Sequence, residues 1–110
     1  MKYNEREESG YKLVEMSGDV DLSCSPQARK QILACLDNCD VGVLVDLSQV
    51  NYIDSSGIAS LVEGYQTAKK NNLNFGLIGV SDAAMNVLQL ARLDTVFPIH
   101  ETVDDRLQAD

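Results

Sequence analysis

Hydrophobic residues recur along this chain with two spacings, one typical of strands and one typical of helices. Short apolar runs bounded by turn residues predict strands, and these runs fall at residues 3–8, 11–17, 43–47, 74–80 and 95–99. The first two flank Ser9-Gly10, a turn dipeptide, so we expect them to form a hairpin. Pro98 has no N–H group to donate, so we expect the last strand to lie at an edge of the sheet.

Apolar residues with helical spacing occupy the intervals between these strands. They predict helices at residues 26–39, 55–70 and 82–91, and a short terminal helix that begins after Thr102. Capping residues stand just before the first three, at Ser25, Asp54 and Ser81. Strands that alternate with helices predict an α/β fold with a largely parallel sheet, and 110 residues suit a single domain.

Charge narrows the range of partners. The chain has 17 acidic and nine basic residues, a formal net charge of −8, and no basic stripe. This balance argues against binding to nucleic acid and against direct contact with an anionic membrane. The apolar runs are well short of the roughly 20 residues needed to cross a bilayer, and the N-terminal residues, with Glu5, Glu7 and Glu8, lack a signal-peptide pattern. We therefore expect a cytoplasmic protein.

Three cysteines and one histidine are the candidate metal ligands. Cys35 and Cys39 share a face of the first predicted helix, but that face is an apolar stripe. The stripe also contains Ala28, Ile32 and Leu36. Free cysteine commonly packs as a small hydrophobe, so we expect both thiols in the core. An odd number of cysteines argues against a disulfide framework, and His100, beyond the last predicted strand, stands apart from them. We expect no metal site and no cofactor.

The segment Asp54-Ser55-Ser56-Gly57 follows a buried strand and opens an amphipathic helix. A helix N-terminus has unpaired N–H groups and about half a positive charge, which favour a bound or attached phosphate. An ordinary N-cap explains Asp54 or Ser55 as well. One cap satisfies a helix, however, and Gly57 costs helix stability, so we expect it to allow close approach of a partner. Parallel strands end at one rim of a sheet, where we expect Asp21 to join Asp54.

The stretch from Asp46 to Ile58 reads DLSQVNYIDSSGI and resembles the signature of STAS domains, specifically those of bacterial anti-sigma factor antagonists. Gly18-Asp19-Val20-Asp21 is similar to the Gly-x-Leu-Asp segment of that family, and residues 81–97 are similar to its third helix and last strand. The resemblance implies that residues 1–110 form a single STAS domain. It also implies a mixed four- to five-stranded sheet with an N-terminal hairpin, and about four helices packed mainly on one side rather than on both.

The resemblance implies a function as well. In these antagonists a kinase phosphorylates the serine directly after the aspartate, which corresponds to Ser55 here, with Ser56 the less favoured target. The kinase is an anti-sigma factor of the histidine-kinase-like ATPase type. It binds the unphosphorylated antagonist and releases the phosphorylated form, and a PPM-type serine phosphatase reverses the reaction. The implied partner-binding residues are Asp21, Asp54, Ser55, Ser56 and Gly57.

Other functions stay open at this point. STAS modules also serve lipid-transport ABC complexes and partner-switching systems without a sigma factor. The segment Leu22-Ser23-Cys24-Ser25 departs from the histidine, threonine or asparagine that often follows the Gly-x-Leu-Asp segment, so we expect its contacts to suit a particular partner. An enzyme would use Ser55 as nucleophile and His100 as base, but no sequence feature brings these two together. We therefore expect a regulatory protein and not an enzyme.

Overall fold

Five strands form one mixed sheet in the computed structural model, which describes residues 2–101. The strands are β1 (Lys2–Glu8), β2 (Tyr11–Val20), β3 (Gly42–Ile53), β4 (Asn74–Ile78) and β5 (Ile99–His100). They lie in the order β1-β2-β3-β4-β5, so each strand pairs with the next one in sequence. β1 and β2 are antiparallel, and each later pair is parallel. The predicted mixed sheet with an N-terminal hairpin is confirmed.

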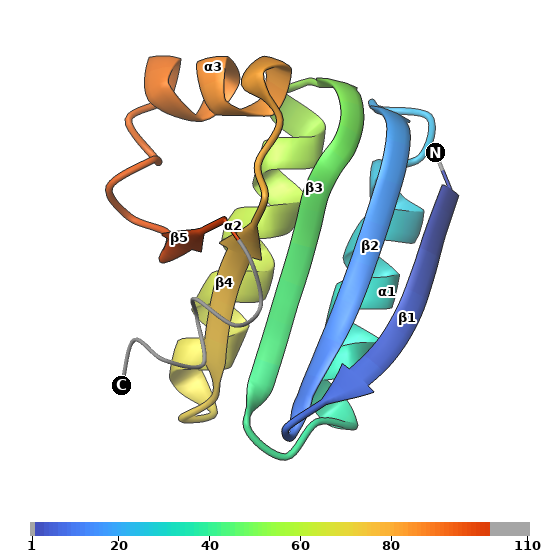
Figure 1. Cartoon of the computed structure of the whole chain (residues 1–110), viewed down its shortest axis with the longest axis vertical. Coiled ribbons are helices and arrows are strands. Elements are labelled where there is room, and N and C mark those ends of the chain that lie inside the picture. Colours follow the sequence, from blue (N-terminus) through green and yellow to red (C-terminus); the bar gives the residue numbers. More distant parts are fainter. Residues whose placement is uncertain (1, 102–110) are drawn as a thin grey trace.

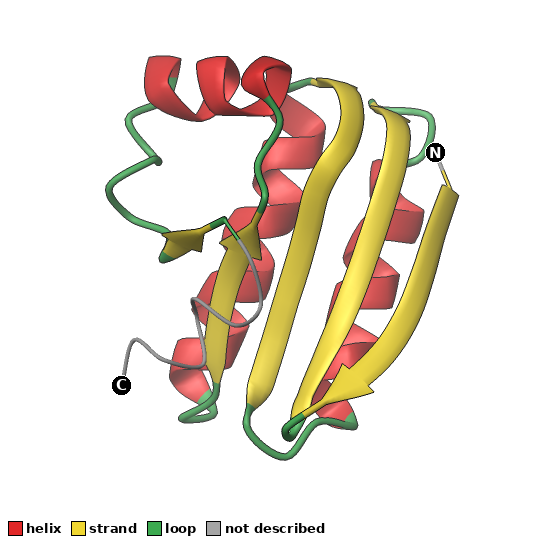
Figure 2. Cartoon of the chain, in the orientation of Figure 1, coloured by secondary structure: helices red, strands yellow, loops and turns green. Residues whose placement is uncertain are grey.

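Three helices connect the strands within residues 2–101: α1 (Ser25–Asp37), α2 (Ser55–Lys70) and α3 (Asp82–Leu90). α1 and α2 lie side by side behind the sheet, and α3 lies across one end of it (Figure 1). Figure 2 shows that both long helices cover the same face, which confirms packing mainly on one side. The helix expected after Thr102 lies outside the described residues. In residues 2–101, no helix combines the length and the apolar character that a membrane span requires.

Two chain reversals use residues that tolerate a left-handed backbone. Ser9 and Gly10 have φ angles of 53° and 86°, as a two-residue hairpin turn requires. α2 ends with Asn71 as its C-cap, and Asn72 follows with a φ of 59°. Asparagine adopts this conformation more readily than most residues. The predicted hairpin and the predicted end of α2 are therefore confirmed.

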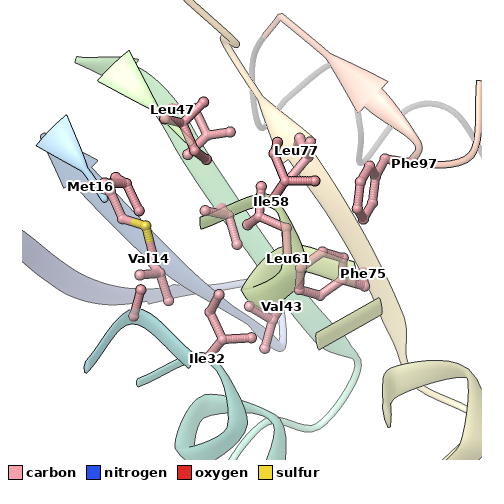
Figure 3. Close-up of a cluster of buried hydrophobic side chains, with 14 of the residues drawn as sticks. Val14, Met16, Ile32, Val43, Leu47, Ile58, Leu61, Phe75, Leu77 and Phe97 are labelled. Carbon is pink, nitrogen blue, oxygen red and sulfur yellow. The ribbon is translucent and has the colours of Figure 1, made fainter. Parts of the chain in front are cut away.

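The core fills the space between the sheet and the layer of α1 and α2 (Figure 3). Val14, Val45 and Leu77 lie in register across β2, β3 and β4, and each is fully buried. Ile32 of α1 and Leu61 of α2 belong to the same cluster. Burying a side chain of this size stabilises the fold by about 1.5–3 kcal/mol. The apolar helix-facing side of the sheet therefore fixes where α1 and α2 lie, and with them the residues at their N-terminal ends.

The cysteines of α1 and its C-terminal loop pack in this core, as the apolar stripe predicted. Cys35 is 2% exposed and belongs to the core cluster, and Cys39 packs against it. The Cys35 thiol donates to Glu5 Oε1 at 3.0 Å. Burial, reinforced by that carboxylate, raises the pKa of Cys35 to about 12. The thiol is therefore protonated at neutral pH.

Several strand boundaries differ from the predicted ones. β3 continues past residue 47 to Ile53, because its backbone still pairs with β2 where most of its side chains become exposed, although Val50 and Ile53 stay buried. β2 likewise continues to Val20, with an irregular register around Gly18, whose φ is 83°. β4 ends at Ile78 rather than at residue 80, since the φ of 56° at Gly79 turns the chain. The two central strands thus reach further toward the start of α2 than apolar runs indicate.

The predictions for the start of α1 and for the last strand were wrong in detail. Cys24, not Ser25, is the residue before α1, and its side chain makes no capping hydrogen bond. The Asp21 carbonyl instead accepts the N–H groups of Cys24 and Ser25, at 3.0 and 2.8 Å. β5 is confined to two residues and includes His100, while Phe97 lies in a turn and is buried. Tertiary packing of Phe97, rather than strand pairing, accounts for that apolar run.

Candidate functional site

Asp54 joins the end of β3 to the start of α2. Its backbone is extended, with φ −102° and ψ −175°, as an N-cap requires. One carboxylate oxygen, Oδ1, accepts hydrogen bonds from the N–H groups of Ser56 and Gly57 at 2.9 and 3.0 Å. The same oxygen accepts from the Ser56 hydroxyl at 2.5 Å. These donors, the hydroxyl first among them, lower the pKa of Asp54, so the cap is an anion at neutral pH.

The second oxygen of Asp54 holds the loop between β2 and α1. Oδ2 accepts from the N–H group of Leu22 at 3.1 Å, although the two residues are 32 positions apart in sequence. The backbone N–H of Asp54 donates to the Val20 carbonyl at 3.2 Å. One residue therefore caps α2 and also ties its start to the end of β2.

Asp21 lies in this loop and borders the same rim of the sheet. Its Oδ1 accepts from the N–H and the hydroxyl of Ser23, at 3.0 and 2.5 Å. The bonds from Ser23 lower the pKa of Asp21, and the negative charge of nearby Asp54 opposes that shift. Two ionised carboxylates thus flank the start of α2. The structure brings Asp21 and Asp54 together as expected from the parallel strands.

The two serines of this segment differ in what their hydroxyl groups do. The Ser56 hydroxyl is engaged with Asp54 Oδ1, and its side chain is half-buried. Ser55 is exposed, and within residues 2–101 its hydroxyl makes no hydrogen bond. A kinase or any other reagent arriving from solvent therefore meets a free hydroxyl at Ser55 and an occupied one at Ser56.

Gly57 is buried against the end of β2 and β3. A Cβ atom there would lie 2.8 Å from the Val20 carbonyl oxygen and 2.7 Å from Ile53 Cγ1. The close approach expected at this glycine is therefore made by the domain's own strands. Gly57 contributes to the surface only by letting α2 begin close to β2.

A shallow groove of about 280 Å³ runs between α1 and α2 beside Ser56. Its floor includes Ser60, whose hydroxyl donates to the Ser25 carbonyl at 3.1 Å and so links the two helices. At the far end of the groove Arg29 forms an ion pair with Glu63, and each side chain is about half exposed, so the pair adds little stability. The lining consists of Ser25, Pro26, Arg29, Ser56, Ala59, Ser60 and Glu63.

Sequence reasoning missed this groove and the role of Leu22. Arg29 and Glu63 are 34 positions apart, and the contact between their helices follows from packing rather than from any local pattern. The sequence signal at Leu22 is weak, because single exposed apolar residues are common on protein surfaces. Its bond to Asp54 could not be inferred from sequence spacing.

His100 lies in β5, two strands away from β3 in the sheet. It aligns with Ile78 of β4, which aligns with Asp46 of β3. Asp46 precedes Ile53 by seven residues, and strand residues advance about 3.3 Å each, so roughly 20 Å of β3 separate this level from the start of α2. The one histidine considered as a base for a Ser55 nucleophile therefore lies away from the serine.

The fold described above is that of a STAS domain. The model of the STAS domain family matches residues 2–106, and the chain belongs to this family. An anti-sigma-B factor antagonist of Listeria monocytogenes is 20% identical over 84 residues, which are 76% of this chain and 74% of that protein. The chain is thus similar in sequence to regulators of sigma factors.

Solved structures of antagonists share the fold. An anti-sigma factor antagonist from Mycobacterium paratuberculosis is 28% identical, with a TM-score of 0.87 over 98% of this chain and 92% of that chain. The antagonist SpoIIAA in its unphosphorylated form is 15% identical, with a TM-score of 0.82 over 99% and 98%. The phosphorylated form of Bacillus SpoIIAA is 14% identical, with a TM-score of 0.74 over 97% of both chains. At these identities the SpoIIAA structures bear on the fold alone.

Proposed function

We propose that this chain is an anti-sigma factor antagonist whose binding is switched by phosphorylation of Ser55. The observation that carries the proposal is the position of Ser55, an exposed serine directly after the charged cap Asp54 at the first residue of α2. STAS family membership and the antagonist relatives support the same role. In this proposal the unphosphorylated chain binds the anti-sigma factor and thereby frees a sigma factor.

A phosphate on Ser55 would change the charge of the rim without disturbing the fold. It adds about −1.5 to −2 charges at a helix N-terminus, where the helix dipole favours an anion. The N–H groups of Ser56 and Gly57 already bond to Asp54, so the phosphate stays on the exposed side and the cap is retained. Beside Asp21 and Asp54 it repels a surface that fits a neutral hydroxyl. The complex then separates while the domain stays folded.

The proposal assigns two partners with opposite actions. A serine kinase of the histidine-kinase-like ATPase type, which is itself the anti-sigma factor, binds and phosphorylates the domain. A PPM-type serine phosphatase removes the phosphate. Asp21, Asp54, Ser55 and Ser56 form the contact surface, and Gly57 acts through its place in the cap. Because the kinase uses ATP, we place the switch in the cytoplasm.

Two substitutions at Ser55 test the switch. Ser55→Ala should retain the kinase permanently, and Ser55→Asp should weaken capture by at least roughly tenfold, which corresponds to about 1.4 kcal/mol of repulsion. Pull-downs from the native cell compare both variants with the wild type, and mass spectrometry locates phosphoserine on the wild-type chain. Ser56→Ala is the matched control and should still be phosphorylated and released.

Each outcome bears on one version of the proposal. If Ser55→Asp captures the kinase as well as the wild type does, the charge switch is wrong. Stable copurification with an ABC ATPase instead would favour a STAS subunit of a lipid-transport complex. A captured kinase that binds no sigma factor would favour a partner-switching regulator with another output. Stoichiometric labelling of Ser55 by a fluorophosphonate probe would favour an enzyme.

A further inference from the structure

Leu22 is an exposed leucine directly beside the proposed phosphorylation site. Its side chain is 73% exposed, and it lies in the loop between β2 and α1. Single exposed apolar residues are ordinary on protein surfaces; within the described part of the chain Val41, Tyr52, Leu90 and Val96 are others. Leu22 differs from these because the carboxylate that caps α2 also holds its backbone.

The loop around Leu22 is ordered by hydrogen bonds on both of its sides. The Leu22 N–H donates to Asp54 Oδ2 at 3.1 Å. The Asp21 side chain accepts from Ser23 at 3.0 Å, and the Asp21 carbonyl accepts from Cys24 at 3.0 Å. A side chain presented by a fixed loop loses little freedom when a partner covers it, so more of its burial appears as affinity. The fixed backbone therefore preorganises the Leu22 side chain for contact with a partner protein.

The surroundings of Leu22 are acidic. The sequence has no lysine or arginine between Lys12 and Arg29, nor between Lys30 and Lys69, so neither the loop nor the start of α2 carries a positive charge. Asp21 and Asp54 stand on either side of the leucine in the hydrogen-bond network. A buried apolar contact supplies attraction at this rim that does not depend on charge.

We propose that Leu22 is the apolar anchor by which this domain docks on the serine kinase that phosphorylates Ser55. The inference rests on the proposed function and adds the chemistry of the contact: next to its nucleotide site the kinase carries an apolar pocket sized for one leucine. Docking of Leu22 places the Ser55 hydroxyl at the terminal phosphate of ATP, because Asp54 joins the leucine backbone to the start of α2. Leu22 thus selects the kinase, and Ser55 receives the phosphate.

Competition between wild type and each variant for the same kinase measures how much Leu22 contributes to the rate of Ser55 phosphorylation, and it needs no purified kinase. Leu22→Ala and Leu90→Ala have the same mass, so each is mixed separately with wild type, as full chains at equal concentration, in an extract of the native cell with ATP. Intact-protein mass spectrometry follows the two phosphorylated forms in each mixture, and the ratio of initial rates equals the ratio of kcat/KM. Leu90, 86% exposed on α3, is the matched control for losing an exposed leucine.

Leu22→Ala should be phosphorylated about 10- to 30-fold more slowly than wild type, the loss expected for an anchor residue truncated to alanine. Leu90→Ala should keep pace with wild type, and Leu22→Met should recover most of the rate because it refills an apolar pocket. The Leu22→Ala ratio should not change with added salt, since apolar burial is not screened. Equal thermal unfolding of Leu22→Ala and wild type checks that the loop is intact.

The outcomes separate the inference from the function on which it rests. If wild type gains no phosphate on Ser55, the proposed function fails and the anchor fails with it. If wild type is phosphorylated and Leu22→Ala keeps pace, only the anchor is overturned. If the ratio of the wild-type rate to the Leu22→Ala rate falls toward one at high salt, the apolar pocket is overturned. If Leu90→Ala loses as much phosphorylation rate as Leu22→Ala, the assignment to this loop is overturned.

Discussion

Replacing Gly57 with alanine tests whether the start of α2 must lie against β2. The new Cβ would stand 2.7 Å from Ile53 Cγ1, 2.8 Å from the Val20 carbonyl oxygen and 3.0 Å from Val20 Cγ1. Ordinary contact begins near 3.4 Å. The Val20 carbonyl accepts the N–H group of Asp54 at 3.2 Å, so it cannot turn away without giving up that hydrogen bond. The helix start has to move.

The size of the effect follows from these distances. Restoring contact from 2.8 to 3.4 Å requires a shift of about 0.6 Å at the helix start. Overpacking of this kind costs about 1–3 kcal/mol, and the better helix propensity of alanine returns up to about 1 kcal/mol. We expect Gly57→Ala to lower the free energy of unfolding by about 1–2 kcal/mol. For a domain of this length the melting temperature falls by roughly 5–15 °C.

Gly57→Ala should reduce the rate of Ser55 phosphorylation more than its loss of stability alone would. The shift moves Asp54 and Ser55 away from the loop that carries Leu22, so Ser55 phosphorylation in native extract should slow even well below the melting temperature. Gly64→Ala is the matched control. Its Cβ would lie 2.6 Å from Ile32 Cγ2, so it also destabilises, but it lies about two and a half helical turns beyond Ser55. Its phosphorylation rate should stay near that of wild type.

Three results would refute this reasoning. A melting temperature of Gly57→Ala at or above that of wild type would mean that the contact with Val20 is not tight. An unchanged phosphorylation rate would mean that the distance between α2 and β2 does not matter to the kinase. An equal loss of rate in Gly64→Ala would assign the effect to overall stability.

Two further predictions concern titratable groups. Hydrogen bonds lower the pKa of Asp54 below 3.8, so its contribution to stability is complete above that pH and is lost as the pH falls through the lowered pKa. The free energy of unfolding, measured with urea, should therefore fall more steeply below about pH 4 in wild type than in Asp54→Ala. Parallel plots of this free energy against pH would contradict the prediction. Burial raises the pKa of Cys35 to about 12, so iodoacetamide should label half-exposed Cys24 first by peptide mapping; early labelling of Cys35 would contradict its burial.

The parts of the fold that could be predicted depend on neighbours in sequence. The hairpin at Ser9-Gly10 and the cap at Asp54 involve residues within three positions of each other, so local rules were sufficient. The core position of Cys35 followed from helical spacing in the same way, whereas α1 ends at Asp37, before Cys39, which packs against the core from the loop. The position of Ser55 at the start of a helix after a buried strand is also a local property.

The parts that were missed depend on contacts between distant elements. The bond from Leu22 to Asp54 and the burial of Gly57 against Val20 arise only when β2 and β3 lie side by side. In each case a polar or small residue has a local use in sequence and a different, tertiary use in the fold.

The four residues from Asp54 to Gly57 look redundant as a helix start, yet each has a separate task. One carboxylate oxygen of Asp54 accepts the hydrogen bonds that cap α2, and the other accepts the N–H group of Leu22. Ser56 completes the cap with its hydroxyl, and Gly57 lets β2 approach. A serine in the cap position would have its own hydroxyl engaged in the cap. Because Asp54 and Ser56 make the capping hydrogen bonds of α2, the fold does not depend on a hydrogen bond from the Ser55 hydroxyl. Adding a phosphate to that hydroxyl, or removing it, would therefore leave the fold intact.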